Sequence, residues 1–408
     1  MANLDPNRDW KALLSFLPDD YERLAEEHKQ VRLQWSSAKI TSVDQLLRLI
    51  FVHVGADLPL RQTVALVGDS GGPKLSAVRL HVKMRSALPY LEALVARMTS
   101  FTADGAPERW SGYELVAVDA TTVSVPGSVG TDARIHTVVR LHDLALLHVR
   151  VTDPSVGETL KRFAWSPGQL IIADRGYSNA AGVAWAVDQG ADVLVRVNRG
   201  ALPLFDGDET IDVLAWCRTL TGHRACERRT QIEHREGRNT RRIEGRLIGF
   251  RLPDKEATEA RERVRDEYGS KTTAEQLEAA GYVVLFTTAP VERLSAARCI
   301  EAYRLRWQIE LQFKRWKSIC HFDRLPNYRD DTIRSWLCAK VLLGLLLDRM
   351  DSAAPELSPP VQLAVPEQQP RFGARVPSHR APHRAAAVEA HDDPLARPRR
   401  RDSPHDAL

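Results

Sequence analysis

The chain has 408 residues, of which 43% are hydrophobic and 27% charged, ordinary values for a globular protein of two or three domains. The net charge of +4 is too small to indicate nucleic-acid binding by itself, although residues 223–265 carry thirteen Arg and Lys against eight Asp and Glu. Five cysteines without a C-x-x-C spacing argue against a disulfide framework, and no apolar run approaches the roughly 18 residues of a membrane span, so we expect a soluble, cytoplasmic protein.

The first part of the chain, residues 1–105, has the apolar spacing of helices, for example in "SVDQLLRLIFVHVG". Residues 58–88 predict a short helix, the glycine-rich turn "GDSGGPK" and a second helix that carries Arg79 and Lys83. This is the outline of a helix-turn-helix, whose second helix would enter a DNA groove. The turn is longer than in most such motifs, so an ordinary helical hairpin is the alternative.

At about residue 113 the helical spacing gives way to short runs rich in Val, Leu and Thr. Three consecutive antiparallel strands are predicted, in "YELVAVDATTVSVPG", "RIHTVVRLHD" and "LALLHVRVTD". A short helix in "GETLKRFAW", a buried strand in "GQLIIADRGYS", a helix at 179–190 and a strand at 191–198 follow. Residues 106–199 therefore predict an α/β layer fold with the element order of an RNase H-like core.

The remaining sequence divides into three parts. Residues 200–290 predict an inserted, mainly β subdomain with basic strands, a charged helical stretch and a returning strand "YVVLFTTAP". Residues 291–350 predict the C-terminal helices of the core, one long helix from about 295 to 318 and another in "DTIRSWLCAKVLLGLLLDRM". Residues 351–408 hold ten of the 23 prolines and keep no apolar period, so they predict a disordered tail.

Two carboxylates follow buried strands of the predicted core. Asp119 ends the first strand, in "LVAVDATT", and Asp174 ends the fourth, in "LIIADRGYS". An RNase H-like core places these strands side by side, so the two acids are expected to be neighbours at the edge where an α/β sheet presents its chemistry. Each motif is also good turn material, which is the structural alternative.

A third carboxylate, Glu310, lies in the basic stretch "YRLRWQIELQFKRWK", residues 303–317. The stretch lacks Gly and Pro and predicts a helix. At about 100° per residue, Tyr303, Arg306, Glu310 and Lys317 fall within about 60° of arc. A neighbouring apolar side is expected to pack into the core and consists of Leu305, Ile309, Phe313 and Trp316. A solvated surface helix with an Arg306–Glu310 pair is the alternative.

The three acids predict a metal site if the helix brings Glu310 to Asp119 and Asp174. Carboxylate oxygens are hard ligands that suit Mg²⁺ or Mn²⁺. Two such ions roughly 4 Å apart activate a water or a 3′-hydroxyl and stabilise the leaving oxygen of a phosphodiester. The sequence therefore favours metal-dependent chemistry on a nucleic-acid backbone.

The spacing Tyr-x2-Arg-x3-Glu-x6-Lys ending at Lys317, together with "VDAT" at Asp119 and "ADRGY" at Asp174, resembles the DDE-type transposases of bacterial insertion sequences, in the subgroup similar to insertion sequence family four. The resemblance covers about residues 30–350. It implies that Asp119, Asp174 and Glu310 are catalytic and bind two Mg²⁺ or Mn²⁺ ions.

The resemblance also implies how DNA is bound. Tyr303, Arg306 and Lys317 would hold phosphates near the cleaved end, and Trp307 is a candidate for stacking on a base, with core packing as its alternative. The implied partners are the element's inverted repeats and the target DNA, bound by a homodimer associated with the bacterial nucleoid, without a membrane. Relatives of this kind carry an inserted β domain, cut both strands through a DNA hairpin and paste the excised element elsewhere.

Two other functions stay open at this point. A hydrolytic nuclease on the same core needs the acids but no end-specific DNA binding. An inactive, truncated relative would bind the element's ends and repress transposition, and the composition of residues 351–408 is typical of a truncated or frameshifted gene copy. Specific binding to inverted repeats and metal-dependent cleavage distinguish the three.

Overall fold

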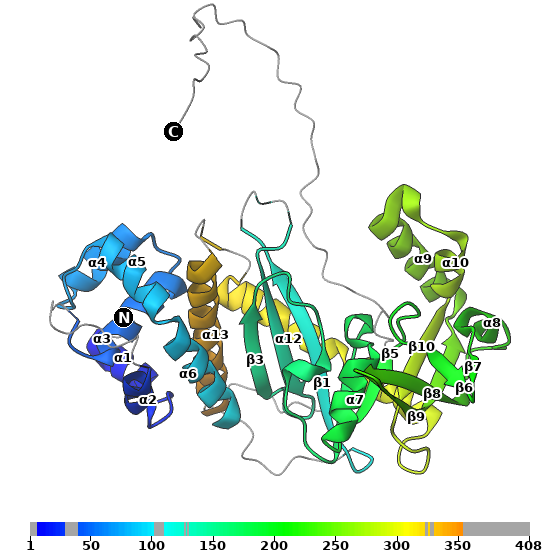
Figure 1. The fold of residues 1–408 in the computed structure, drawn as a ribbon. Helices are drawn as coiled ribbons and strands as arrows, with labels where there is room; N and C mark the ends of the chain where they lie inside the picture. The colour runs from blue at the N-terminus through cyan, green and yellow to red at the C-terminus, as the bar shows by residue number, and fades with distance from the viewer. Residues whose placement is uncertain are drawn as a thin grey trace, which may run out of the picture. The chain divides into compact units, whose positions relative to one another are not determined.

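Helices make up the N-terminal part of the computed structural model, which describes residues 6–28, 40–101, 110–125, 128, 130–322, 325–326 and 330–353 (Figure 1). The predicted helical character of this part is confirmed where the chain is described. Its helices are α1 (Pro6–Leu14), α2 (Tyr21–Glu27), α3 (Val43–Gly55), α4 (Leu60–Asp69), α5 (Ala77–Ser86) and α6 (Leu88–Phe101).

The helix pair α4–α5 has the predicted outline, with the glycine-rich residues 70–76 between the two helices. Ser76 caps α5 because its hydroxyl accepts a hydrogen bond from the backbone N–H of Arg79 at 3.3 Å. Leu80 and Met84 are fully buried, and α5 packs mainly against α4, α6 and α13 (Asp330–Ala353). The opposite side of α5, which includes Arg79, is exposed to solvent.

The first five strands pair in the spatial order β3-β2-β1-β4-β5. The first three are antiparallel neighbours, whereas β4 is parallel to both β1 and β5. This arrangement confirms the α/β fold and the RNase H-like order predicted from the sequence. The strands are β1 (Glu114–Val123), β2 (Ala133–Arg140), β3 (Leu146–Thr152), β4 (Gln169–Ala173) and β5 (Asp192–Arg196), with helix α7 (Ala180–Asp188) between the last two.

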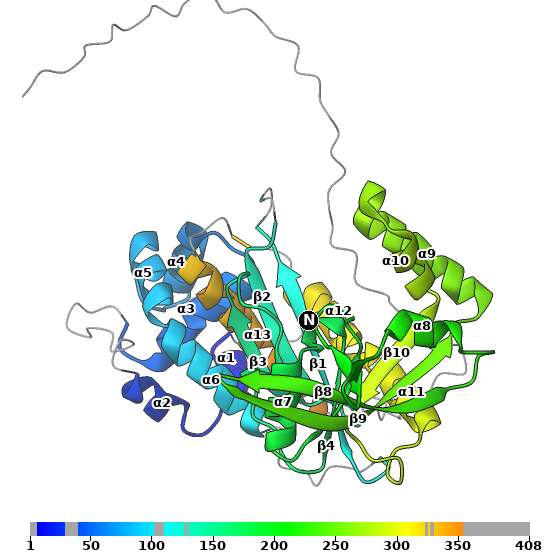
Figure 2. The same ribbon diagram turned by 45° about the vertical axis from the view of Figure 1, so that its right-hand side comes forward.

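The strands of the insertion do not form a separate sheet. β10 pairs antiparallel with β5, and the sheet continues through β9, β8, β6 and β7 to ten strands within the described residues (Figure 2). The strands are β6 (Leu204–Asp206), β7 (Glu209–Thr210), β8 (Cys226–Glu236), β9 (Asn239–Arg251) and β10 (Tyr282–Thr287). The helices are α8 (Val213–Arg218), α9 (Asp254–Tyr268) and α10 (Ala274–Ala279). Residues 6–353 all belong to one compact unit, so the predicted division into domains stays a prediction.

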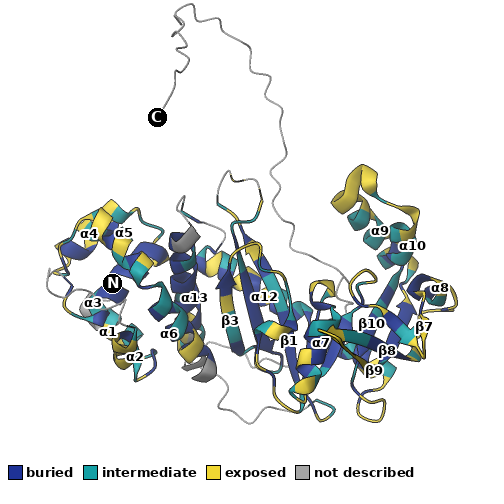
Figure 3. Ribbon diagram, viewed as in Figure 1, coloured by how far each residue is buried: buried dark blue, intermediate teal, exposed yellow. Residues whose placement is uncertain are grey.

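Both faces of the central strands are buried (Figure 3). Leu115 and Ala117 of β1 belong to one hydrophobic core, which the N-terminal and C-terminal helices cover. Val116 and Val118 belong to a second core on the other face, which α7 and the insertion cover. This alternation explains why β1 and β4 read as continuous apolar runs rather than as alternating ones.

The long helix predicted from about 295 to 318 is interrupted, and the prediction was wrong at this point. The structure has α11 (Ala296–Leu305) and α12 (Trp307–Cys320), with Arg306 in a turn between them. The N–H of Arg306 donates to the carbonyl of Tyr303 at 3.2 Å, and the N–H of Ile309 donates to the carbonyl of Arg306 at 3.1 Å. These bonds span three residues instead of four, so the helix tightens locally.

A second correction concerns "GETLKRFAW", for which we expected a short helix. Only a single 3₁₀ turn forms there, Leu160–Arg162 (η2), capped by the Thr159 hydroxyl that accepts from the N–H of Lys161. The chain leaves the turn in an extended conformation at Phe163 because Phe163 and Trp165 bury their rings in the second core. Packing of aromatic side chains therefore overrides the local helix signal.

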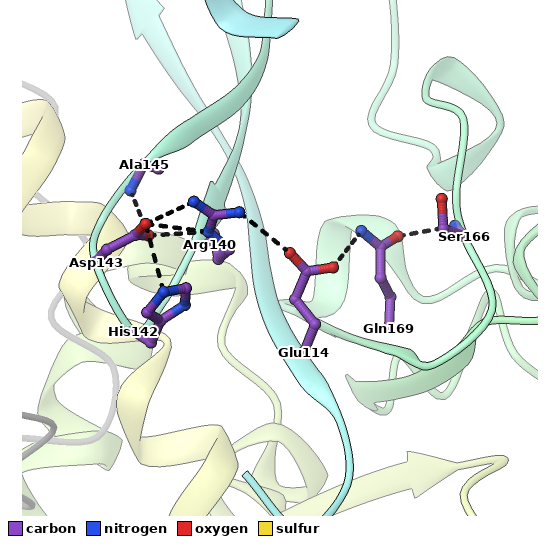
Figure 4. A network of polar contacts seen from close by, with 7 residues as sticks. All are labelled: Glu114, Arg140, His142, Asp143, Ala145, Ser166 and Gln169. Carbon is purple, nitrogen blue, oxygen red and sulfur yellow. Dashed lines mark hydrogen bonds and ion pairs between the residues drawn. The ribbon is translucent and has the colours of Figure 1, made fainter. Parts of the chain in front are cut away.

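A polar network fixes the register of β1 against β4 at the edge opposite the acids (Figure 4). The buried Arg140 side chain forms ion pairs with Glu114 at 3.7 Å and with Asp143 at 2.6 Å. Gln169, the first residue of β4, donates to Glu114 at 3.0 Å. Since a slip of one residue would turn every side chain to the wrong face, these contacts also fix where the strands end.

No helix in the described part of the chain combines the length and the apolar character needed to span a membrane. The predicted disordered tail lies outside the described residues, except for 351–353, which are the last residues of α13.

Candidate active site

Asp119 and Asp174 are neighbours because β1 and β4 are paired in parallel. Five residue pairs join the strands, the last of them Val118 with Ala173, and each acid comes directly after this pair. Paired strands lie about 4.8 Å apart. We had predicted that Asp119 ends its strand, and this was wrong. The pairing of β1 with β2 continues to Val123 after the pairing of β1 with β4 has stopped.

The alternation of side chains places both acids on the face covered by α11 and α12. Successive residues of a strand point to opposite faces, so Asp119 shares the face of Ala117, and Asp174 follows Ile172 in the same way. Ala117 and Ile172 belong to the core that also contains buried residues of the two helices, namely Cys299, Ala302, Tyr303, Leu305, Ile309, Phe313, Trp316 and Cys320. The predicted apolar side of the helix is thereby confirmed.

Two side chains, Tyr303 of α11 and Arg306 of the turn, contact all three acids. The Tyr303 hydroxyl donates a hydrogen bond to Asp174 Oδ1 at 3.3 Å. Arg306 Nη1 donates to Asp119 Oδ2 at 3.4 Å, and Arg306 Nη2 donates to Glu310 Oε1 at 2.7 Å. Tyr303 is 5% exposed and Arg306 is 8% exposed, so these contacts lie in a largely water-free environment. A solvated surface helix does not describe this segment.

The acids raise the electrostatic cost of each other's negative charge. Burial raises the pKa of the Asp119 carboxyl to about 7, and the negative charges of Asp174 and Glu310 act in the same direction, while Arg306 opposes them. Burial followed by the charge of Asp174 raises the pKa of Tyr303 to about 12, so its hydroxyl stays protonated and donates. The cluster therefore favours the binding of positive charge.

Two arginines beside Asp174 were missed in the sequence analysis. Burial raises the pKa of Asp174, but the charges of Arg306 and Arg196 and a backbone hydrogen bond from Arg175 outweigh it, so the pKa lies below its ordinary value. Arg196 ends β5, where Val195 pairs with the last residue of β4. A charged residue at the end of an apolar strand was the signal that identified the acids, and it would have identified Arg196 as well.

The other predicted site residues lie farther along the helices. Lys317 is half-buried in the last turn of α12. Trp307, the first residue of α12, is half-buried, and in the described part of the chain its buried indole Nε1 has no hydrogen-bond partner. Arg79 and Lys83 lie on α5, which packs on other helices and not mainly on the strands that carry the acids. The roles of all these residues stay predictions.

The fit of the acids to metal ions can be judged from their contacts. The described residues include no group of three or more His, Cys, Asp or Glu side chains placed to hold one ion. Instead, the positively charged guanidinium of Arg306 lies between Asp119 and Glu310 and contacts both carboxylates. The donors are all carboxylate oxygens, which hard divalent cations prefer. They already accommodate the positive charge of Arg306, so the chemistry of the three acids fits ions that are shared among them.

The comparison with known families identifies the class of protein. Residues 110–346, more than half of the chain, match the family model of the transposase DDE domain. The chain belongs to this family of DDE transposases, which are enzymes that cleave DNA and transfer strands. Members of the family generally depend on divalent metal ions.

Particular relatives are insertion-sequence proteins. The chain is 30% identical over 367 residues to the transposase InsL of insertion sequence element IS186A from Escherichia coli strain K12. This match covers 88% of this chain and 98% of the relative. It is also 30% identical over 368 residues, with the same coverage, to the transposase for insertion sequence element IS421 from Escherichia coli. A shorter match, 32% over 100 residues, joins 24% of the chain to 21% of the transposase for element IS231F from Bacillus thuringiensis subsp. israelensis.

Proposed function

We propose that this transposase binds the inverted-repeat ends of an insertion sequence and moves the element by cut-and-paste transposition. Asp119, Asp174 and Glu310 would hold two Mg²⁺ or Mn²⁺ ions. When bound, these ions would supply the charge that activates the attacking water or 3′-hydroxyl and stabilises the leaving oxygen. A DNA hairpin would join the two strands during excision, as the resemblance to relatives with an inserted β domain implies.

One observation supports this proposal above the others. Three acids from distant parts of the chain, on β1, just after β4 and on α12, are joined by the two side chains Tyr303 and Arg306 of a single motif. Gathering three partly buried carboxylates around one guanidinium costs stability, because each charge loses part of its hydration, and such a cost is typically kept where function requires it. Perturbed carboxyl groups at the edge of an α/β sheet are typical of an active site.

The cationic and aromatic residues would bind and orient the DNA. Arg306 presents a forked set of donors that suits a phosphate, and Tyr303 adds a hydroxyl donor. Lys317 would contact a phosphate farther from the cut, and Trp307 would stack on a base. Because Arg306 contacts two of the acids, we expect it to exchange these contacts for phosphate contacts when ions and DNA bind.

The helix α5 would contribute sequence recognition away from the acids. Its exposed Arg79 and half-buried Lys83 lie on the second helix of a helix pair, the position that enters the major groove in helix-turn-helix proteins. We further propose that a homodimer forms on DNA, in the bacterial nucleoid, so that two active sites act on the two ends of the element.

The test is cleavage of a labelled duplex that carries the inverted repeat flanking the gene, with Mg²⁺ or Mn²⁺. We expect cutting at the repeat boundary, a loss of at least about 100-fold in Glu310→Gln because the third carboxylate is removed, and unchanged DNA binding by that variant. Glu301→Gln is the matched control, since Glu301 lies on α11 and forms a surface pair with Arg298 at 2.7 Å, away from the acids. Mn²⁺ should also raise the melting temperature of the wild type more than that of Glu310→Gln.

Other outcomes would assign another function. Equal cutting by the wild type and Glu310→Gln would contradict the three-carboxylate site. End-specific binding without cutting by any of the proteins would identify an inactive repressor. Metal-dependent cutting without preference for the repeat would identify a hydrolytic nuclease.

A further inference from the structure

Three arginines gather on the face of the sheet opposite α12. Arg134 of β2 pairs with Thr152 of β3, and Arg150 of β3 pairs with His136 of β2. Residues that oppose each other in an antiparallel pair share a face, so all four side chains lie together. Arg162 joins them from η2, which packs on α7 over the same face.

The guanidinium groups of two of these arginines meet at one loop. Arg134 Nη1 donates to the carbonyl of Val156 at 3.1 Å, and Arg162 Nη2 donates to the next carbonyl, that of Gly157, at 2.7 Å. Burial and the positive charges of Arg150 and Arg134 lower the pKa of Arg162. Within the described residues, the buried Nε atoms of Arg134 and Arg162 have no hydrogen-bond partner. A concentration of positive charge is suited to an anion.

A buried histidine connects this cluster to the acids. His136 Nε2 lies 3.0 Å from the Thr152 hydroxyl, and its Nδ1 lies 3.4 Å from the Tyr177 hydroxyl. Tyr177 belongs to the 3₁₀ turn that begins directly after Asp174. Burial, followed by the charges of the nearby arginines, lowers the pKa of His136 to about 3, so the ring is neutral at physiological pH and adds no charge of its own.

We propose that Arg134, Arg150 and Arg162 form a second binding site for the phosphates of a DNA backbone, separate from the phosphate contacts of α11 and α12. The inference rests on the proposed transposase function, because it assigns the cluster to DNA that is already held at the acids. The ligand is recognised by its negative phosphodiester oxygens, so the contacts specify position and not sequence.

The strand pairing sets where the cluster lies relative to the acids. Ala120, the residue after Asp119, pairs with His136, which pairs with Arg150, so Arg150 lies two strand spacings, about 10 Å, from β1 and on the face opposite the acids. The cluster would therefore meet phosphates of DNA that extends beyond the cut, and not the phosphate held at the acids. Such phosphates belong to DNA flanking the element before excision, or to the target DNA during strand transfer.

The first experiment measures affinity for a labelled duplex, with the inverted repeat and ten flanking base pairs, as a function of salt. Arg150→Gln and the double variant Arg150→Gln/Arg162→Gln are compared with Lys161→Gln. Lys161 is an exposed residue of η2, so its substitution removes one positive charge outside the cluster. If flanking DNA occupies the site, each cluster substitution should weaken binding about 10-fold and lower the slope of log K against log salt by about one. Melting temperatures check that the variants fold.

A second experiment detects occupancy by target DNA. Precut ends are supplied without flanking DNA, and joining to a target plasmid is measured. If the target occupies the site, the double variant should join the ends at least about 10-fold more slowly than the wild type, while Lys161→Gln joins them at the wild-type rate.

The outcomes separate this inference from the proposed function. If the wild type binds and cuts the repeat, but both cluster variants match Lys161→Gln in binding, cutting and joining, the second site is refuted and the transposase function stands. If the wild type neither binds nor cuts the repeat, both are refuted.

Discussion

Buried ionisable side chains in this protein are accommodated in two ways. At the acids, the opposite charge of Arg306 offsets part of the repulsion, and Asp119 still has a pKa of about 7 because of burial. At His53 and His136 burial keeps the ring neutral instead, with pKa values lowered to about 4 and about 3, and at His53 it outweighs the opposing charge of Asp57. Only the first arrangement gives a site that attracts cations.

His53 makes the second arrangement testable through the pH dependence of stability. Its ring is 1% exposed, its Nδ1–H donates to the carbonyl of Leu58 at 2.6 Å, and its buried Nε2 has no partner in the described part of the chain. The folded pKa of about 4 lies below the ordinary 6.5, so the unfolded state binds more protons between these values. Stability is therefore complete above pH 6.5 and is lost as the pH falls toward 4, by up to about 1.4 kcal/mol per pH unit.

Between pH 7 and pH 5 the free energy of unfolding should fall for both the wild type and His53→Asn. We expect the fall to be smaller in His53→Asn by about 1–2 kcal/mol. Asn is chosen because its amide can donate to Leu58 in place of Nδ1–H. Urea unfolding at pH 7, 6 and 5 measures the difference, and His223→Asn, at an exposed position, should keep the wild-type pH dependence. Equal slopes for His53→Asn and the wild type would contradict the assignment.

At the scale of elements, local patterns predicted the sheet core and the acids but not how distant segments meet. The apolar runs before Asp119 and Asp174 mark buried parallel strands, and the apolar side of the 303–317 segment marks the packed side of its helix. The turn at Arg306 has no sequence signal, because Arg is a good helix former and one of the two acids that its side chain contacts, Asp119, is far away in the sequence. The pairing of β10 with β5 likewise depends on tertiary contacts.

The junction between β9 and β10, inside the insertion and next to the pairing of β10 with the core strand β5, depends on one glycine of β9. A Cβ atom on Gly245 would overlap the Phe286 ring of β10 and lie 2.8 Å from the carbonyl oxygen of Thr287. We expect Gly245→Ala to lower the free energy of unfolding by about 1–3 kcal/mol, because the overlap forces the strands apart. Gly200→Ala is the matched control, since its Cβ would meet nothing closer than Asn198 at 3.8 Å.

Chemical denaturation of the two alanine variants measures this difference, and limited proteolysis reports where the chain opens. Cleavage within the insertion of Gly245→Ala, at protease concentrations that leave Gly200→Ala intact, would locate the damage at this junction. A Gly245→Ala protein as stable as Gly200→Ala would show that Phe286 moves aside without cost.

At the scale of the whole molecule, α13 connects the N-terminal helices to the catalytic sheet. It contacts α3, α5 and α6 on one side and β3 and α12 on the other (Figure 1). Its fully buried Lys340 donates to Asp57 Oδ1 at 2.6 Å and to the carbonyl of His321 at 2.9 Å. Asp57 lies between α3 and α4, and His321 follows α12, so one ammonium group ties the N-terminal helices to the helix that carries Glu310.

Removing this ammonium group should loosen both connections at once. We expect Lys340→Met to lower the free energy of unfolding by about 2–4 kcal/mol, because Asp57 and the His321 carbonyl lose their partner while the apolar stem is kept. This loss is smaller than the roughly 3–5 kcal/mol typical of a broken buried ion pair. The Asp57 side chain is 23% exposed, so its carboxylate regains some hydration. Lys314→Met, at an exposed position of α12, is the matched control and should change stability by less than about 0.5 kcal/mol.

The variant also tests whether the two parts unfold together. If Lys340 couples them, we expect the wild type to unfold in a single transition and Lys340→Met in two. The double variant Asp57→Asn/Lys340→Met should recover part of the lost stability, since no unpaired carboxylate remains. A Lys340→Met protein that unfolds in one transition at the wild-type midpoint would show that apolar packing of α13 alone joins the N-terminal helices to the core.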